Sequence, residues 1–418
     1  MDEVRQALID GHRQLPRIGA VRAGTSTSLP FVVVDAHGEE IEPFSTFLRD
    51  LMLTDTSPLT GRSYGQDLLR WWRLLYALGL GWERATRAEV EVLVGWMRSA
   101  ENPQRRRSSS TASGSVNRRT GKRVLGSGYA PATINHALSV VSSFYTFHAQ
   151  FGRGPVANPV PASSTRRARL AHRSPLEPRP EHRRAPLRQK SAELVPRSIP
   201  DKLADELLAA MRNTRDRALL ALFLSTGARA SELLGVTGDR VDWTRQQLWV
   251  ISKGTRSLQP VPASPEALRL LAAYFEEHGT PAGDEVIWRT LRGKPQPLSY
   301  FAARRVLQRA NDQLGTDWSL HDLRHTTIER MTADPNLTLE DIMLVTRHQH
   351  VTSLDPYLRP RVEEVFDRLQ VHYGTPRPEP RPTPGYDDAD FKTVFGGGLD
   401  RGLDGGLSEG RSTGEVDG

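Results

Sequence analysis

Apolar residues recur at helical spacing through the first part of the chain and predict a small helical bundle. Along four segments the apolar side chains fall at three- and four-residue steps, which places them on one face of a helix. These segments are residues 43–53, 64–79, 86–97 and 131–148. Thr86 and Glu89 have the spacing of a capping box, which marks a helix start. We therefore expect an all-helical domain over residues 31–158, preceded by a flexible arm over residues 1–30.

A different pattern begins near residue 196 and predicts a second domain that is mostly helical with a small β-sheet. Residues 216–225 are apolar on almost every side, as expected for a buried helix. Residues 247–252 and 258–262 are predicted to be strands joined by a tight turn, and residues 286–288 a third short strand. With the second domain spanning residues 196–374, the expected fold class is mainly α with a small β-sheet.

Three segments are too polar or too rich in proline and glycine to bury a core. Residues 101–129 are rich in Arg, Ser and Gly and are expected to form an exposed basic insertion that does not pack. Residues 159–195 combine prolines with many arginines, which predicts an extended basic linker. Residues 375–418 are expected to be a flexible tail, acidic and rich in glycine.

The distribution of charge along the chain favours a polyanionic partner. The 418-residue chain carries a formal net charge of +7, and its last 32 residues hold eight acidic and three basic side chains. The body of the protein is therefore more basic than the whole, which favours nucleic acid as a partner, and a general bias toward arginine is the less favoured explanation of the charge. No secretory signal or long apolar run is present, so a cytoplasmic location is expected. The absence of cysteine excludes disulfides, thiolate metal sites and a cysteine nucleophile.

Arg229 and Lys253 are the first candidates for phosphate chemistry. Arg229 directly precedes a short predicted helix, where a guanidinium and backbone N–H groups can both point at anionic oxygens. Glu232 is three residues further on and is expected to hold that guanidinium. Lys253 lies on the turn between the two predicted strands, which can carry one ammonium into a groove. Each residue taken alone is also common as a purely structural feature.

Histidines and a tyrosine complete the candidate set further along the chain. His321 and Arg324 are three residues apart on a helix that Asp322 helps to cap, so they share a face. His325 points elsewhere and is expected to orient or pack. His348 is the next candidate, and Tyr357 follows it nine residues later. Because a proline precedes it, the tyrosine is expected on a loop or at a helix start.

Two stretches resemble the conserved boxes of the tyrosine recombinases, the phage integrase family. Thr-Gly-Ala-Arg-Ala-Ser-Glu-Leu-Leu-Gly-Val at 226–236 is similar to the first box, and Ser-Leu-His-Asp-Leu-Arg-His at 319–325 to the second. The positions of Lys253 and Tyr357 keep the family's spacing, whereas Arg347 stands where the family often has glycine. The resemblance covers residues 196–374 most strongly. It implies an N-terminal helical core-binding domain of SAM-like fold and an α+β catalytic domain.

The resemblance also implies a reaction, the site-specific cutting and rejoining of DNA. Tyr357 would attack the scissile phosphorus and form a 3′-phosphotyrosyl link. His321 is the expected general base and Lys253 the expected general acid. The charge on the non-bridging oxygens would be stabilised by Arg229, Arg324 and His348. No metal, other cofactor or ATP is expected, because these cations supply the positive field and one phosphate ester replaces another.

The expected partner is a double-stranded DNA recombination site on a mobile element, bound by basic residues in both domains, the insertion and the linker. Integration, excision or transposition of that element would be the biological role. A dimer on one site and a tetramer in synapsis are implied, joined through the C-terminal segment. The predicted DNA contacts are Arg105, Arg106, Arg107, Arg118, Arg119, Arg166, Arg167, Arg169, Arg183, Arg184, Arg256 and Arg347.

Other functions fit part of the pattern and stay open. A type IB topoisomerase-like enzyme or a hairpin-end-resolving enzyme would share the chemistry but not the outcome, and two-duplex strand exchange separates them. A DNA-binding regulator with a silent site would keep the fold without the cleavage. A metal hydrolase is disfavoured because the histidines lack a carboxylate cluster at ligand spacing.

Overall fold

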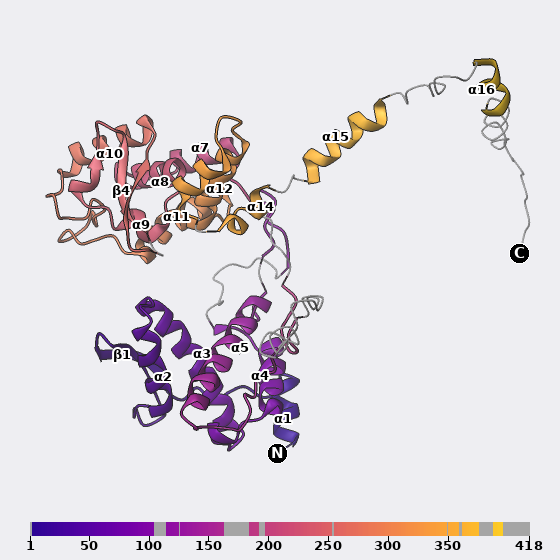
Figure 1. The fold of residues 1–418 in the computed structure, drawn as a ribbon. Coiled ribbons are helices and arrows are strands. Elements are labelled where there is room, and N and C mark those ends of the chain that lie inside the picture. The colour runs from indigo at the N-terminus through magenta and orange to yellow at the C-terminus, as the bar shows by residue number, and fades with distance from the viewer. Residues whose placement is uncertain are drawn as a thin grey trace, which may run out of the picture. The chain divides into compact units, whose positions relative to one another are not determined.

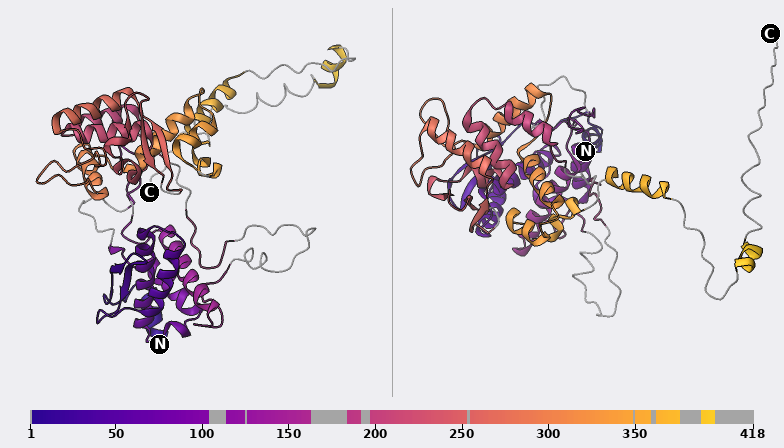
Figure 2. Two further views of the ribbon diagram at one scale, coloured as in Figure 1. Left: turned by 60° about the vertical axis from the view of Figure 1, so that its left-hand side comes forward. Right: turned by 90° about the horizontal axis from the view of Figure 1, so that it is seen from above.

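The computed structural model describes residues 2–103, 114–124, 126–162, 184–191, 197–252, 255–348, 350–358, 362–375 and 388–395. The chain divides into two compact units, residues 1–353 and 354–418. Within the first unit, buried apolar residues form two separate cores. We call the parts around them the helical lobe, residues 2–162, and the second lobe, residues 197–353. Figures 1 and 2 show them in indigo to purple and in pink to orange.

The helical lobe confirms the four predicted helices and adds elements before them. Its helices are α1 (Asp2–Ile9), α2 (Glu42–Leu53), α3 (Pro58–Ala77), α4 (Arg87–Ser99) and α5 (Pro131–Gln150). The capping box of Thr86 and Glu89 is present at the start of α4. Two strands, β1 (Ala20–Ser26) and β2 (Leu29–Val34), form an antiparallel hairpin. Fully buried aromatic and aliphatic side chains of α3 and α5, among them Trp71 and Phe144, fill the core.

The prediction of a flexible arm over residues 1–30 is wrong. The segment contains α1 and β1, and Leu8 on α1 is fully buried. Arg5 also forms an ion pair with the buried carboxylate of Glu89 on α4. The segment lacks a long apolar stripe of its own, because it contributes only a few side chains to a core that later helices build.

The second lobe combines a small sheet with helices, as predicted, although the first strand of this sheet is not among the predicted strands. The sheet has the order β3-β4-β5 and is antiparallel throughout, with β3 (Val241–Asp242), β4 (Gln247–Ile251) and β5 (Leu258–Pro262). Its helices are α7 (Asp201–Ala209), α8 (Thr214–Thr226), α9 (Ala230–Leu234), α10 (Pro265–His278), α11 (Tyr300–Leu314), α12 (Leu320–Ala333) and α13 (Leu339–Thr346). Nearly every side chain of α8 is buried, which explains its apolar character on all sides. The predicted third strand at 286–288 is reduced to a single bridge between Thr237 and Val286.

The insertion at residues 101–129 also differs from its prediction. Its described part at residues 115–124 folds back on itself and contacts the second lobe, so that Thr120 is buried. Packing through polar side chains leaves no apolar pattern in the sequence, which is why the sequence predicts an unpacked insertion. Residues 104–113 lie outside the described residues.

The second unit consists of short helices. They are α14 (Asp355–Leu358), α15 (Val362–Gly374) and α16 (Asp388–Phe395). The last of these lies inside the segment predicted to be a flexible tail, most of which is outside the described residues. In the described parts of the chain, no helix has the length and apolarity needed to span a bilayer.

Candidate active site

Arg229 is placed by the sharp turn between two helices of the second lobe. Helix α8 ends at Thr226, and Gly227 takes a left-handed conformation with φ of 57°. The chain then enters α9, with Arg229 as the residue that caps its start. The Arg229 side chain stays partly exposed, about 30%. A guanidinium at this place can reach solvent and an anion while its backbone is fixed.

One buried carboxylate organises this corner of the site. Glu232 Oε1 accepts a hydrogen bond from Arg229 Nη1 at 2.8 Å, and its Oε2 accepts one from the Arg229 backbone N at 2.9 Å. Oε2 also accepts one from Arg347 Nη2 at 2.8 Å. Burial by itself would raise the pKa of Glu232, but the positive charges and hydrogen bonds of Arg347 and Arg229 overcome it and lower the pKa to about 2. Glu232 is therefore ionised and fixes both guanidiniums, which supports the predicted role toward Arg229.

Arg347 is a structural arginine in this site. It ends α13 in the left-handed region, with φ of 57°, where glycine has no steric penalty. Its side chain is only 3% exposed, and Nη1 donates to the carbonyl of Val345 at 2.6 Å. Because the guanidinium is engaged with Glu232 inside the lobe, this geometry does not support the predicted DNA contact of Arg347.

Arg324 lies on the first turns of α12, a helix that begins with a capping box. The Ser319 hydroxyl accepts from the backbone N of Asp322, and the Asp322 carboxylate accepts from the backbone N of Ser319 at 2.7 Å. The Arg324 guanidinium is buried and donates to the carbonyls of Gly227 and Thr346, each at 2.5 Å. These carbonyls end α8 and α13, so a single side chain ties together three helices of the site.

The hydrogen bonds around His348 determine its tautomer. Arg324 Nη2 lies 3.1 Å from His348 Nε2, and a guanidinium can only donate, so Nε2 accepts. The Thr346 hydroxyl donates to the carbonyl of Ile342 at 2.5 Å and therefore accepts from His348 Nδ1 at 2.9 Å. Burial and the nearby charges of Arg324, Arg229 and Arg347 lower the pKa of His348 to about 4. His348 is thus a neutral ring protonated on Nδ1, and it helps to orient Arg324.

His321 and His325 stack edge to face on the exposed side of α12, with ring centroids 4.1 Å apart. Burial and the charges of Arg324 and Arg229 lower the pKa of His321, opposed by Asp322. Burial and His321 are the main causes that lower the pKa of His325 to about 4. Both rings are therefore neutral near pH 7, and a neutral His321 can accept a proton.

The structure brings together Arg229, Arg324, His321 and His348 but does not settle the two remaining members of the predicted set. Lys253 lies outside the described residues. Its neighbours Ser252 and Thr255, which flank the turn between β4 and β5, line a cavity of about 390 Å³ together with His348. Tyr357 lies in α14 of the second unit, a short helix that begins at Asp355. Its place at a helix start agrees with the sequence prediction.

The predicted DNA contacts divide into three groups. Arg118, Arg184 and Arg256 are exposed, although Arg256 forms an ion pair with Asp55 at 2.9 Å. Arg119 is exposed but is held by the second lobe, where it donates to the carbonyl of Leu314. The others, apart from Arg347, lie outside the described residues: Arg105, Arg106, Arg107, Arg166, Arg167, Arg169 and Arg183.

Sequence reasoning missed the groups that hold the site in place. Gly227 and Thr346 act through backbone carbonyls, and Arg347 acts through a buried ion pair. A carbonyl leaves no mark in a sequence, but an arginine at a position that favours glycine is a signal of a compensating partner.

Comparison with known proteins defines the class. Residues 197–364 match the profile of the phage integrase family. Residues 197–364 therefore form a phage integrase domain, and the chain is similar to tyrosine recombinases. It is 26% identical over 266 residues to tyrosine recombinase XerC of Roseiflexus castenholzii, covering 57% of this chain and 75% of the relative. To tyrosine recombinase XerD of Pseudomonas aeruginosa it is 26% identical over 188 residues, covering 42% of this chain and 62% of the relative.

Solved structures confirm the fold at lower sequence identity. A lambda integrase dimer bound to a core site has a TM-score of 0.51 at 14% identity, over 75% of this chain and 96% of that one. The Tn1549 transposon integrase in complex with circular intermediate DNA has a TM-score of 0.50 at 12% identity, over 78% of this chain and 98% of that one. The chain therefore has the tyrosine recombinase fold, in agreement with the expected combination of a helical core-binding domain and an α+β catalytic domain.

Proposed function

We propose that this chain cuts and rejoins duplex DNA at specific sites through a covalent 3′-phosphotyrosyl link on Tyr357. The observation that carries the proposal is the gathering of Arg229, Arg324 and His348, with Arg324 and His348 in hydrogen-bond contact at 3.1 Å. Arg229 is near enough to lower the pKa of both His321 and His348. The guanidiniums of Arg229 and Arg324 suit the non-bridging oxygens of a phosphodiester, where developing charge is stabilised by preorganised cations, and His348 orients Arg324.

The first half-reaction exchanges one phosphate ester for another. The Tyr357 oxygen forms a bond to phosphorus as the bond from phosphorus to the 5′-oxygen breaks. His321, which is neutral near pH 7, takes the tyrosine proton, and Lys253 gives a proton to the departing 5′-oxygen. Tyrosine needs this base because its ordinary pKa is about 10. Each positioned acid or base is expected to contribute about 10²–10⁴-fold.

The second half-reaction reverses these steps. A 5′-hydroxyl from a second duplex attacks phosphorus, the tyrosyl ester bond breaks, and the protons return to Tyr357 and Lys253. Bond types are conserved across both halves, so the reaction needs no external energy source. The cations of the site supply the positive field, and the proposed chemistry therefore includes no metal ion.

The proposed substrate is a pair of DNA sites on a mobile element, recombined during integration, excision or transposition. A DNA partner is supported by the basic body of the chain and by solved tyrosine recombinases in complex with DNA. Arg118, Arg184 and Arg256 are exposed and are proposed as phosphate contacts. We further propose a dimer on one site and a tetramer in synapsis, joined by α15, whose apolar side chains Phe366 and Val371 are exposed.

Covalent capture on nicked DNA tests the proposal with a substrate pool that covers many target sequences. A pool of duplexes with a randomised centre and one nick is incubated with the full chain in excess chelator. After cleavage near the nick, the short fragment diffuses away, so the protein stays attached to the remaining strand. Denaturing gels reveal the adduct, and sequencing of the captured strands gives the site.

The expected result is an adduct with the native chain and none with Tyr357→Phe. Tyr373→Phe, which alters an exposed tyrosine of α15, is the matched control and should still form the adduct. An adduct that persists in Tyr357→Phe shows that the nucleophile is misassigned. If the native chain forms no adduct with any sequence of the pool, the proposed function is contradicted. Exchange between two captured duplexes then distinguishes recombination from simple relaxation of supercoiled DNA.

A further inference from the structure

The insertion of the helical lobe carries a compact element that is attached to the second lobe. We call residues 115–124 the docking hairpin. A bridge between Val116 and Arg123 closes it, and the Asn117 backbone N donates to the carbonyl of Lys122 at 2.8 Å. At its tip Gly121 has φ of 63°, which favours glycine. In the sequence the hairpin lies between α4 and α5, so it belongs covalently to the helical lobe.

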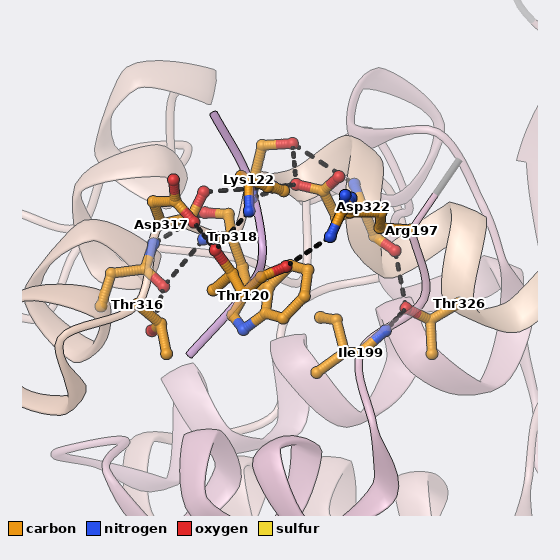
Figure 3. A network of polar contacts seen from close by, with 11 residues as sticks. Thr120, Lys122, Arg197, Ile199, Thr316, Asp317, Trp318, Asp322 and Thr326 are labelled. Atoms are coloured by element: carbon orange, nitrogen blue, oxygen red, sulfur yellow. Dashed lines mark hydrogen bonds and ion pairs between the residues drawn. The ribbon is translucent and has the colours of Figure 1, made fainter. Parts of the chain in front are cut away.

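The tip of the docking hairpin contacts the segment that leads into α12. Thr120 Oγ1 donates to the Asp317 carboxylate at 2.5 Å, and Lys122 Nζ donates to the Asp317 carbonyl at 3.2 Å. The same ammonium forms an ion pair with Asp322 and lies 4.7 Å from the centre of the Trp318 ring. Figure 3 shows Lys122 and Thr120 above this ring, with Asp322 on one side and Asp317 on the other.

Contacts at the edges of the hairpin strengthen the attachment. Arg119 donates to the Leu314 carbonyl at 2.6 Å and pairs with Glu206 at 2.5 Å. Asn117 donates to the carbonyl of Gly315 at 3.1 Å, just after the end of α11. Arg197 Nη1, at the start of the second lobe, donates to the Thr120 carbonyl at 3.3 Å. Thr120 itself is buried, so this is a packed contact rather than a loose one.

Asp322 links this contact to the proposed chemistry. Its Oδ2 pairs with Lys122 and also accepts hydrogen bonds from the backbone N and the hydroxyl of Ser319, each at 2.7 Å. It is therefore both the capping residue of α12 and the anchor of the hairpin. His321 and Arg324 lie on either side of it in the sequence, on the first turns of the same helix. Displacing the hairpin would remove the charge that fixes this carboxylate and so loosen the capping box at the start of α12.

We propose that Lys122 is a positioning residue of the proposed recombination reaction, which sets the first turn of α12 through Asp322 and so couples the helical lobe to the catalytic groups. The inference rests on the proposed function, because it concerns that same site. When the helical lobe engages DNA, the docked hairpin keeps His321 and Arg324 in register for strand cleavage. In this role Lys122 acts through Asp322 rather than by contact with DNA or the reacting atoms.

Substitutions at Lys122 separate positioning from DNA binding. Lys122→Met keeps an unbranched stem over Trp318 but removes the charge. At saturating DNA, single-turnover cleavage by the full chain should fall at least tenfold, whereas the Kd for DNA changes less than threefold. Lys122→Arg should recover the rate to within threefold of the native chain. Lys202→Met, at an exposed lysine of α7, is the matched control and should behave as the native chain.

Two readouts distinguish positioning from a general loss of structure. Lys122 is one of the charges that lower the pKa of His325, so Lys122→Met should raise that pKa, and NMR titration of the ring measures it. The chain has no cysteine, so Thr120→Cys with Asp317→Cys gives a unique thiol pair for a short bifunctional linker. Linking this pair in the Lys122→Met background should restore cleavage, because the hairpin is held again.

The proposal is overturned if Lys122→Met cleaves at the native rate, or if its loss lies entirely in the Kd for DNA. It is also overturned if linking leaves the rate low and the pKa of His325 does not rise. Amide hydrogen exchange in residues 320–325 decides the matter independently of cleavage, since undocking should speed exchange there. If the native chain itself cleaves no DNA, the proposed function fails, and unchanged exchange in Lys122→Met then refutes the positioning role as well.

Discussion

Replacing Glu232 by glutamine tests whether one buried carboxylate holds the basic side of the site together. The substitution keeps the size of the side chain and one carbonyl oxygen but removes the negative charge. Arg229 and Arg347, which both bond to that carboxylate, would then face a neutral amide whose N–H₂ group cannot accept their hydrogen bonds. The Arg347 side chain cannot turn to solvent without leaving the lobe, because only 3% of it is exposed.

The expected loss of stability follows from the pKa of Glu232. Arg347 and Arg229 overcome the effect of burial and lower this pKa from 4.5 to about 2. Because the side chain is 1% exposed, solvent screens the interaction little. At neutral pH the shift corresponds to about 3 kcal/mol of folding stability, within the ~3–5 kcal/mol typical of a broken buried ion pair. A lowered carboxyl pKa stabilises the fold above the unfolded value near 4.5, and this stability is lost as pH falls toward 2.

Urea unfolding of the full chain provides the measurement, with amide hydrogen exchange in α8 and α9 as the local readout. A local readout is needed because a chain with two cores does not unfold in one step. Glu232→Gln should lower the free energy of unfolding by about 3 kcal/mol at pH 7, and the deficit should shrink between pH 4.5 and pH 3. Glu276→Gln, at an exposed glutamate of α10, should stay within about 0.5 kcal/mol of the native chain.

A deficit below about 1 kcal/mol at pH 7 would refute the reasoning, because surface ion pairs contribute no more than that. A deficit that is the same at pH 7 and pH 3 would refute it too, because it would then arise from packing rather than charge. Combining Glu232→Gln with Arg347→Met gives a double-mutant cycle. The two losses should not add, since each substitution removes the same contact.

Four further outcomes are expected. Both Gly227 and Gly79 have positive φ, and replacing either by alanine should cost about 1–2 kcal/mol for the left-handed conformation alone. Gly227→Ala should destabilise the protein more than Gly79→Ala in thermal unfolding, because the added Cβ at residue 227 would lie 3.2 Å from Thr327. Burial is the main cause that lowers the pKa of His348 to about 4. The neutral ring therefore stabilises the fold above about pH 6.5, and this stability is lost as pH falls toward 4. NMR titration of the ring should give a pKa near 4, and a pKa near 6.5 contradicts the prediction. Lys253→Ala should abolish cleavage of ordinary DNA but not of a 5′-bridging phosphorothiolate, whose sulfur leaves without an acid. The affinity for DNA should fall steeply with salt, and a flat slope contradicts multiple phosphate contacts.

The helices and the two central strands can be predicted because their signals are local. A stripe of apolar residues on α3, a capping box at Thr86 and an all-apolar α8 each leave a complete pattern within one segment. The folded N-terminal segment and the docking hairpin cannot be predicted in this way, because residues far away in the sequence hold them in place. Leu8 completes a core built by later helices, and Thr120 is buried by residues almost two hundred positions away.

The candidate site divides in the same way. His321 and Arg324 share a helix face because they are about one turn apart, whereas Arg229 comes close to them through the Gly227 carbonyl, to which Arg324 donates across 97 residues. The partner of Arg347 cannot be predicted, because Glu232 is 115 residues away and its spacing in the sequence points only to Arg229. The sequence therefore predicts that Arg347 meets phosphate, whereas burial directs its guanidinium inward.

The charges around the proposed phosphate site explain why an arginine at a glycine position is compatible with the proposed catalysis. Glu232 is shared by two guanidiniums, so one carboxylate cannot neutralise both Arg229 and Arg347. The carbonyls that hold Arg324 fix its direction but cancel none of its charge. Burial keeps His348 neutral, which lets it accept from Arg324 instead of repelling it. Positive charge therefore remains at Arg229 and Arg324, where in the proposed reaction a phosphodiester would gain negative charge as it is attacked, while Arg347 adds to the field from inside the lobe.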